Sequence, residues 1–171
     1  MIDYDSIYGT LSKLDREYNL KQSDPDFQMP VLISKLAVLE LCGWIEMSLD
    51  QVLNDYISKL SLNDDIKKKL DAIIKHNHGF SFDNNIFPLF CGVLGVKMVA
   101  DLFDSMTDRD YQNLKTVTDN YSKHRNQAAH TDTPNGTTRT YDAPSLVIQA
   151  YNQIKPAVVK MEEFIQKLEA K

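Results

Sequence analysis

The chain has 171 residues, of which 43% are hydrophobic and 25% are charged, and this predicts one globular domain covering residues 1–171. Six glycines and six prolines are few for this length and favour long helices over an all-β design. The net charge of −5 excludes a global electrostatic attraction to nucleic acid, so any RNA contact must come from a local basic patch.

The sequence predicts neither a secretory leader nor a membrane span. The segment Met1 to Asp5 lacks a basic region and an apolar region, so we do not expect a signal peptide. The most apolar stretch, Val31 to Leu53, is interrupted by charged residues, which argues against membrane insertion. Cys42 and Cys91 have no metal-ligand spacing and are expected to be buried free thiols. We therefore expect a cytoplasmic protein with no membrane partner.

Apolar residues at helical spacing predict a short first helix over about residues 2–18 and a second, longer one from about Pro30 to Lys59. The apolar stripe of the second helix is broad, which suggests burial on two sides, against bundle partners and a second protomer. Its members are Leu32, Leu36, Leu39, Ile45, Leu49, Val52, Leu53 and Tyr56. Glu40 and Glu46 interrupt the pattern. They are interpreted as exposed-face glutamates, with a carboxylate facing a functional site as the alternative.

Asn63 is a plausible cap for a third helix, with Asp64 and Asp65 in its first turn. His76 and His78 follow near its end. Their spacing points them apart on a helix; in a loop they could bind a metal, but two histidines without carboxylates are weak evidence. We therefore expect neither a metal site nor a cofactor.

The segment 80–85 is predicted as a loop, followed by a short buried helix over 86–95 and another over 96–106. Thr107 is a plausible start for a helix over 108–130. Pro134, Asn135 and Gly136 make 131–141 the clearest loop of the chain. The last helix opens at Pro144. The resulting fold class is all-α, an up-and-down bundle of four to five helices.

The most informative segment is the end of the helix over 108–130. On an ideal helix Asn126 lies about 100° and His130 about 140° around from Arg125, so the three share one broad polar sector. Arginine can bind phosphate bidentately, and imidazole can transfer a proton near neutral pH. This combination suits chemistry on a phosphodiester. Without further context, cations that complement the helix dipole are an equally good explanation.

The pattern Arg125-Asn126-x-x-x-His130, at the end of a long helix in a helical chain, resembles the R-x4–6-H motif of the HEPN superfamily, and in particular its stand-alone bacterial defence and toxin members. The resemblance implies a helical bundle and a metal-independent endoribonuclease that leaves 2′,3′-cyclic phosphate and 5′-OH ends. It also implies a homodimer whose two motifs form one composite site. An antitoxin or a neighbouring-gene protein is a further expected partner. One departure is Asp132, at a position where some toxin members carry tyrosine.

On this reading His130 is the general acid/base, Arg125 holds and stabilises the scissile phosphate, and Asn126 orients His130 or the phosphate. Lys123, His124 and Arg139 are candidates for the local basic rim that binds RNA. The alternative function is a non-catalytic HEPN-like bundle that binds a partner protein or a nucleotide. In that case Arg125 and His130 are structural.

Overall fold

A computed structural model describes residues 2–23, 28–129 and 140–168 of the chain. These residues form seven α-helices and one π-helix, without a β-strand, which confirms the all-α class. The α-helices are α1 (Tyr4–Lys21), α2 (Gln28–Lys59), α3 (Asp64–Lys75), α4 (Phe87–Leu94), α5 (Val96–Asp104), α6 (Asp108–Ala129) and α7 (Pro144–Lys167), and the π-helix is η1 (Phe82–Ile86). The helices outnumber the four or five expected because three short ones, α3 to α5, accompany four long ones.

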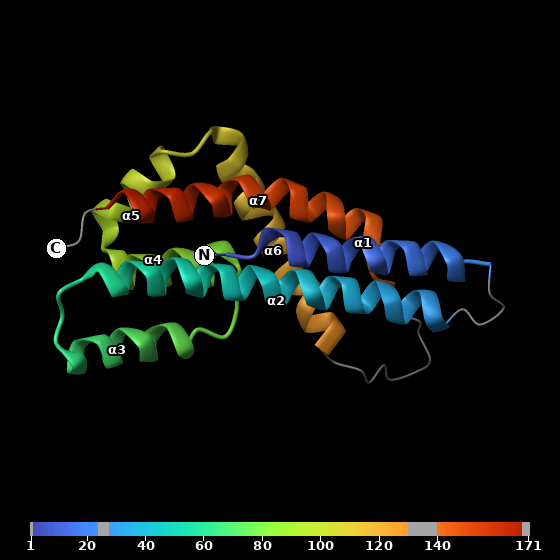
Figure 1. Cartoon of the computed structure of the whole chain (residues 1–171), viewed down its shortest axis with the longest axis horizontal. Helices are drawn as coiled ribbons and strands as arrows, with labels where there is room; N and C mark the ends of the chain where they lie inside the picture. Colours follow the sequence, from blue (N-terminus) through green and yellow to red (C-terminus); the bar gives the residue numbers. More distant parts are fainter. Residues whose placement is uncertain (1, 24–27, 130–139, 169–171) are drawn as a thin grey trace.

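Helix α2, which has 32 residues, is the central element of the fold. Figure 1 shows α1 along its N-terminal half and α3 along its C-terminal half. Helix α7 packs on both α1 and α2, and α6 contacts α2 and α7. The C-terminal end of α6 emerges on the side of α2 where α3 lies (Figure 1). This arrangement brings the motif-bearing end of α6 to the middle of α2.

The core is built from long side chains that these helices bury completely. Those with less than 2% exposure include Leu11, Leu41, Ile45, Leu53, Phe90, Leu114, Tyr151 and Ile154. They come from α1, α2, α4, α6 and α7, so one continuous core joins the long helices. Burying each such side chain contributes about 1.5–3 kcal/mol relative to leaving it in water.

Two predicted helix starts are confirmed by their capping bonds. The backbone N–H of Ile66 donates to Oδ1 of Asn63 at 2.9 Å. The N–H of Asp110 donates to Oγ1 of Thr107 at 3.1 Å. Each bond satisfies a donor that has no partner inside its helix, so both residues define where their helices begin.

The predicted loop over 80–85 is wrong for most of its length, because the π-helix η1 occupies Phe82–Ile86. Phe80, Phe82 and Ile86 are at most 1% exposed and anchor this segment in the core. The backbone N–H of Phe82 also donates to Oδ1 of Asp119 on α6, at 2.9 Å. Polar residues such as Asn84 and Asn85 suggest a loop in the sequence, but these tertiary contacts impose a helical turn.

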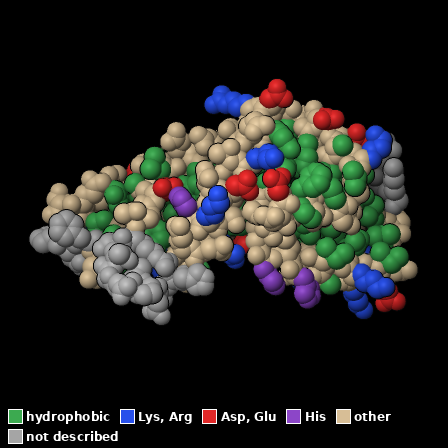
Figure 2. Space-filling model, turned by 180° about the vertical axis from the view of Figure 1, so that it is seen from behind, with side chains coloured by type: hydrophobic (Ala, Val, Ile, Leu, Met, Phe, Trp, Pro, Cys, Tyr) green, Lys and Arg blue, Asp and Glu red, His purple; other side chains and the backbone are tan. Residues whose placement is uncertain are grey.

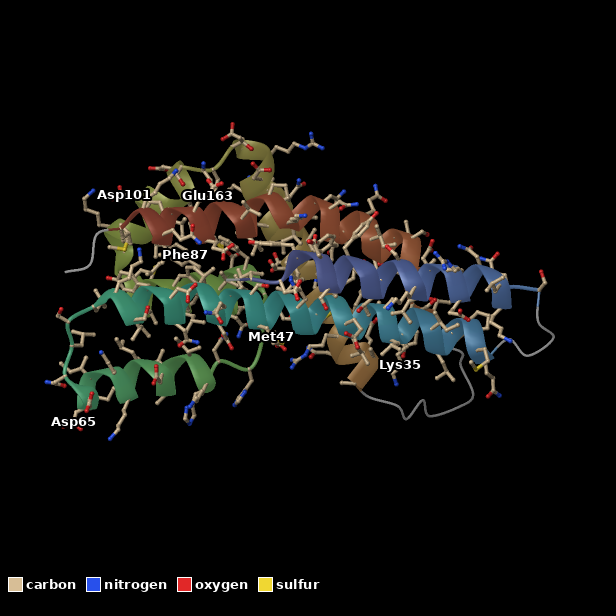
Figure 3. All side chains as sticks on the ribbon, viewed as in Figure 1. Lys35, Met47, Asp65, Phe87, Asp101 and Glu163 are labelled. Atoms are coloured by element: carbon tan, nitrogen blue, oxygen red, sulfur yellow. The ribbon has the colours of Figure 1, made fainter. Side chains whose placement is uncertain are left out.

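Helix α2 is less completely covered than its wide apolar stripe suggests. Leu32 and Leu36 are 54% and 44% exposed, and Met47, which is labelled in Figure 3, is 74% exposed. The helix is therefore buried on one side by α1, α6 and α7 and leaves apolar side chains on the other.

In the described part of the chain no single helix is long and apolar enough to cross a membrane. The segments 82–94 and 96–104 reach that length and composition only as a pair bent by 116°.

A buried carboxylate on α7 joins the beginning of the chain to its last helix. Glu162 is 8% exposed; its Oε1 accepts from the backbone N–H of Ile2 at 3.1 Å, and its Oε2 accepts from the hydroxyl of Tyr4 at 2.9 Å. Burial, together with this carboxylate, raises the pKa of Tyr4 above its usual value. The hydroxyl therefore stays protonated and acts as the donor.

We expect Glu162→Ala to lower the free energy of unfolding by about 3 kcal/mol or more, because it removes the acceptor of two donors, and hydrogen bonds to charged groups contribute about 1.5–3 kcal/mol each. Glu163→Ala is the matched control. Glu163, labelled in Figure 3, is exposed and forms only a loose pair with Lys160 at 3.6 Å. The control should lose less than about 1 kcal/mol. Urea unfolding measures both, and equal losses would contradict the assigned role of Glu162.

Candidate functional site

Arg125, near the C-terminal end of α6, forms an ion pair with α2. Its Nη2 atom lies 3.2 Å from Oε1 of Glu46, and the two side chains are 35% and 28% exposed. A pair with this exposure contributes about 0–1 kcal/mol to stability, so its main effect is to position the guanidinium. The preferred interpretation of Glu46 as an exposed-face glutamate is wrong, because α6 crosses α2 beside it. Glu40 is exposed as expected.

A cavity of about 140 Å³ lies beside this ion pair. Three segments line it, namely α2, the connection between α3 and η1, and the end of α6 (Figure 1). Its polar lining residues are Glu46, Asp50, Asn77, His78 and Arg125. Polar groups from distant parts of the chain therefore converge around the arginine. A concave site with a few convergent polar groups is the usual form of a binding or catalytic site.

Burial changes the acid–base properties of the two carboxyl groups in this cavity. Desolvation raises the pKa of Glu46, and the opposing charges of Arg125 and His78 only partly offset it. Burial also raises the pKa of Asp50, one turn further along α2, and the negative charge of Glu46 adds to this effect. Both carboxyls therefore retain protons to a higher pH than they would in water. Such shifts beside a cavity are characteristic of functional sites, although structural ion pairs produce them too.

His124 is held on a different side of α6, beside the segment that precedes α7. Its Nδ1 atom lies 3.4 Å from Oδ2 of Asp142, and the hydroxyl of Tyr121 donates to the same oxygen at 3.0 Å. The rings of Tyr121 and His124 are 5.3 Å apart between centroids. His124 is thus anchored and half-buried rather than freely mobile on a rim. Its role in RNA binding stays a prediction.

The other predicted site residues fall into two groups. Lys123 and Asn126 are exposed on α6 and are free to meet a ligand from solvent. His130 is the residue directly after α6, and it lies outside the described residues, as do Asp132 and Arg139. The structure therefore gives the surroundings of Arg125 but not its distance from His130.

Three cavity residues were not identified as site residues from the sequence. Asp50 lies one turn after Glu46 on the same helix face, and this spacing of two carboxylates is a sequence signal that indicates a shared site. His78 was considered only as a metal ligand, together with His76. Asn77 carries no local signal at all. These residues meet Arg125 only through tertiary packing, which a single sequence does not reveal.

Within residues 2–23, 28–129 and 140–168, no group of three or more His, Cys, Asp or Glu side chains is arranged to hold a metal ion. Both cysteines are free thiols: Cys42 is buried, as expected, whereas Cys91 is only partly so. Burial raises the pKa of Cys42 to about 12, so its thiol is protonated and unreactive at neutral pH. The chemistry available at the cavity is therefore that of a guanidinium, two carboxyls and an imidazole.

The raised pKa of Glu46 predicts a pH-dependent stability. The folded state holds its proton more tightly than the unfolded state, so ionising Glu46 lowers stability as pH rises from its unfolded pKa, about 4.3, through its folded pKa. The wild type should therefore lose stability relative to Glu46→Gln as the pH rises above about 4. Urea unfolding at several pH values measures this difference, with Glu40→Gln as the control for removing one negative charge from α2. A wild type that gains stability relative to Glu46→Gln over this range would contradict the burial argument.

Comparison of the chain with protein-family models, curated proteins and solved structures found no match. The functional interpretation therefore rests on the motif at the end of α6 and on the cavity around Arg125.

Proposed function

We propose that the chain is a metal-independent endoribonuclease of the HEPN type, with its active site at the end of α6. The observation that supports this most directly is the placement of Arg125. Glu46 holds its guanidinium at 3.2 Å, at the edge of a polar cavity, while 35% of the side chain stays in contact with solvent. An arginine in such a position can bind a phosphate without first being ordered.

The proposed reaction is attack of the ribose 2′-OH on the adjacent phosphate. A base takes the proton of the 2′-OH, an acid protonates the leaving 5′-oxygen, and a cation stabilises the pentacoordinate phosphorane. In this proposal His130 transfers protons, Arg125 holds the phosphate and stabilises its charge, and Asn126 orients one of them. The products carry 2′,3′-cyclic phosphate and 5′-OH ends, and no metal ion is required.

The charge distribution demands a local mode of RNA binding. Figure 2 shows basic and acidic side chains interspersed on the face that it draws, without a continuous positive field among the described residues. Glu46 and Asp50 add negative charge at the cavity itself. RNA must therefore be bound through a few close contacts. The residues that we propose for them are Arg125, Lys123, His124 and Arg139. Because such contacts are few, RNA affinity should fall only moderately as the salt concentration rises.

The family resemblance supplies the proposed setting, which is toxin–antitoxin or phage defence in the cytoplasm. An antitoxin or another neighbouring-gene protein is then the partner that would control the ribonuclease.

The competing proposal is a non-catalytic helical bundle that binds a partner protein or a nucleotide. The ion pair of Arg125 with Glu46 is the observation that favours it, because a paired arginine can serve packing alone. Replacement of Arg125 distinguishes the two proposals. It should abolish RNA cleavage if the chain is a ribonuclease, and change only stability or partner binding if the chain is a non-catalytic bundle.

If the chain is a ribonuclease, His130→Ala should lower the cleavage rate by about 10²–10⁴-fold, as expected for losing a proton-transfer group. Arg125→Ala should be similarly impaired, and Arg125→Lys should not restore activity, because an ammonium lacks the bidentate fork. Asn126→Ala should lower the cleavage rate less than either of these substitutions. Thermal stability should change little in the Arg125 and Asn126 variants, because Arg125 lines a polar cavity and Asn126 is exposed to solvent. The assay uses end-labelled RNA with and without EDTA, and EDTA should have no effect.

Arg109→Ala is the matched control, since Arg109 is an exposed arginine at the opposite end of the same helix. It should cleave like the wild type. Intact RNA with the wild type, together with loss of stability by Arg125→Ala, would support the binding-module proposal instead.

We also propose that the active form is a homodimer with the two Arg125–His130 segments in one cleft. The exposed apolar side chains Leu36 and Met47 support this, because they lie on α2, the helix that carries Glu46. They border a groove of about 720 Å³ between α1 and α2. A second copy seated there would cover apolar surface and bring its own Arg125 to the same region.

Leu36→Asp and Met47→Asp should each weaken dimerisation, because a charge on the covered face must be desolvated. Leu146→Asp is the control, since Leu146 is 51% exposed on α7 and lies outside the groove. Analytical ultracentrifugation over a range of concentrations measures the association. A wild type that remains monomeric at every concentration would overturn the dimer proposal.

A further inference from the structure

A histidine outside the motif lies in the same cavity as Arg125. His78 belongs to the connection between α3 and η1, and it lines the cavity together with Glu46 and Asp50 of α2. Its side chain is exposed enough to meet a ligand from solvent. The cavity therefore offers an imidazole that does not depend on the position of His130.

The connection that carries His78 is held in place at both ends. Ile74 before it is 3% exposed, and Phe80 after it is fully buried. Between them, Nδ2 of Asn77 donates to the backbone oxygen of Gly79 at 2.8 Å, which closes a tight turn around His78. Groups that are ordered before a ligand arrives need no further ordering on binding.

A second set of bonds fixes this turn to the π-helix. Nδ2 of Asn85 donates to Oδ1 of Asn77 at 3.2 Å, and the hydroxyl of Ser81 donates to Oδ1 of Asn85 at 2.8 Å. Gly79 lies directly against this network, because a Cβ added to it would come within 3.0 Å of Oδ1 of Asn85. Only glycine fits there without displacing the asparagine. These bonds tie the turn that carries His78 to the π-helix, on the wall of the cavity that Arg125 also lines.

His76, two residues earlier, provides an internal comparison. It is exposed and does not line the cavity. Its Nδ1–H donates to the backbone oxygen of Ala72 at 2.7 Å, so the ring caps the end of α3. The two histidines have the same side chain and nearly the same sequence position, but only His78 lines the cavity.

We propose that His78 is the general acid that protonates the leaving 5′-oxygen when RNA is cleaved at Arg125. This inference rests on the proposed ribonuclease function and adds a group outside the motif to it. A base takes the proton of the 2′-OH, the 2′-oxygen forms the new bond to phosphorus, and the bond from phosphorus to the 5′-oxygen breaks. The imidazolium of His78 then transfers its proton to that oxygen, which gives the 5′-OH end. No water or oxidant enters this step.

Charged groups from two helices share the cavity with His78. They are the carboxyls of Glu46 and Asp50 on α2 and the guanidinium of Arg125 on α6. In a homodimer each copy would bring its own His78 together with its own Arg125, so the inference is compatible with a composite site.

The test compares His78→Ala with His76→Ala on end-labelled RNA whose cleavage position has been mapped with the wild type. His78→Ala should lower the rate constant for cleavage by about 10²-fold or more, whereas His76→Ala should cleave at nearly the wild-type rate. His78→Gln should also be inactive, because an amide keeps hydrogen bonding but cannot donate a proton.

A second substrate separates an acid from a merely structural residue. The same RNA with sulfur in place of the bridging 5′-oxygen has a leaving group that needs no protonation, so His78→Ala should cleave it at close to the wild-type rate. An active wild type with equal losses on both substrates, or no loss on either, would overturn the inference while leaving the proposed function intact. A wild type that cleaves neither substrate would overturn both.

Discussion

The contact between Arg125 of α6 and Glu46 of α2 is the constraint on which the candidate site depends. It joins two helices that cross in the middle of the fold, and it directs the guanidinium along the edge of a polar cavity. Both side chains are partly exposed, so the pair contributes little to stability, about 0–1 kcal/mol. Its consequence is geometric, because an arginine fixed in this way needs little reorganisation to receive a phosphate. The large buried core around it provides the rigidity, and the ion pair provides the orientation.

The acidic side chains of this cavity would repel the phosphate of a bound RNA. Glu46 and Asp50 are both acidic, and an anionic phosphate beside them is unfavourable unless cations or protons offset their charge. Their raised pKa values reduce this cost, because burial favours the protonated forms. The guanidinium of Arg125 supplies a positive charge at the same cavity.

The sequence predicted the helices well where local signals decide them. Asn63 and Thr107 cap the helices that they were expected to cap, and the absence of alternating apolar runs correctly excluded a sheet in the described residues. It failed at η1, where burial of Phe82 overrides the loop-like composition. It also failed at Glu46, because its partner comes from a distant helix. Position along one helix predicts which residues share a face, but not which face meets another helix.

We propose that the cavity around Arg125 cleaves RNA by attack of the ribose 2′-OH. The most direct measurement is mass spectrometry of the ends of RNA incubated with the purified protein in EDTA. We expect 2′,3′-cyclic phosphate and 5′-OH ends with the wild type and intact RNA with Arg125→Ala. RNA left intact by the wild type, or ends that carry 3′-OH and 5′-phosphate, would contradict it.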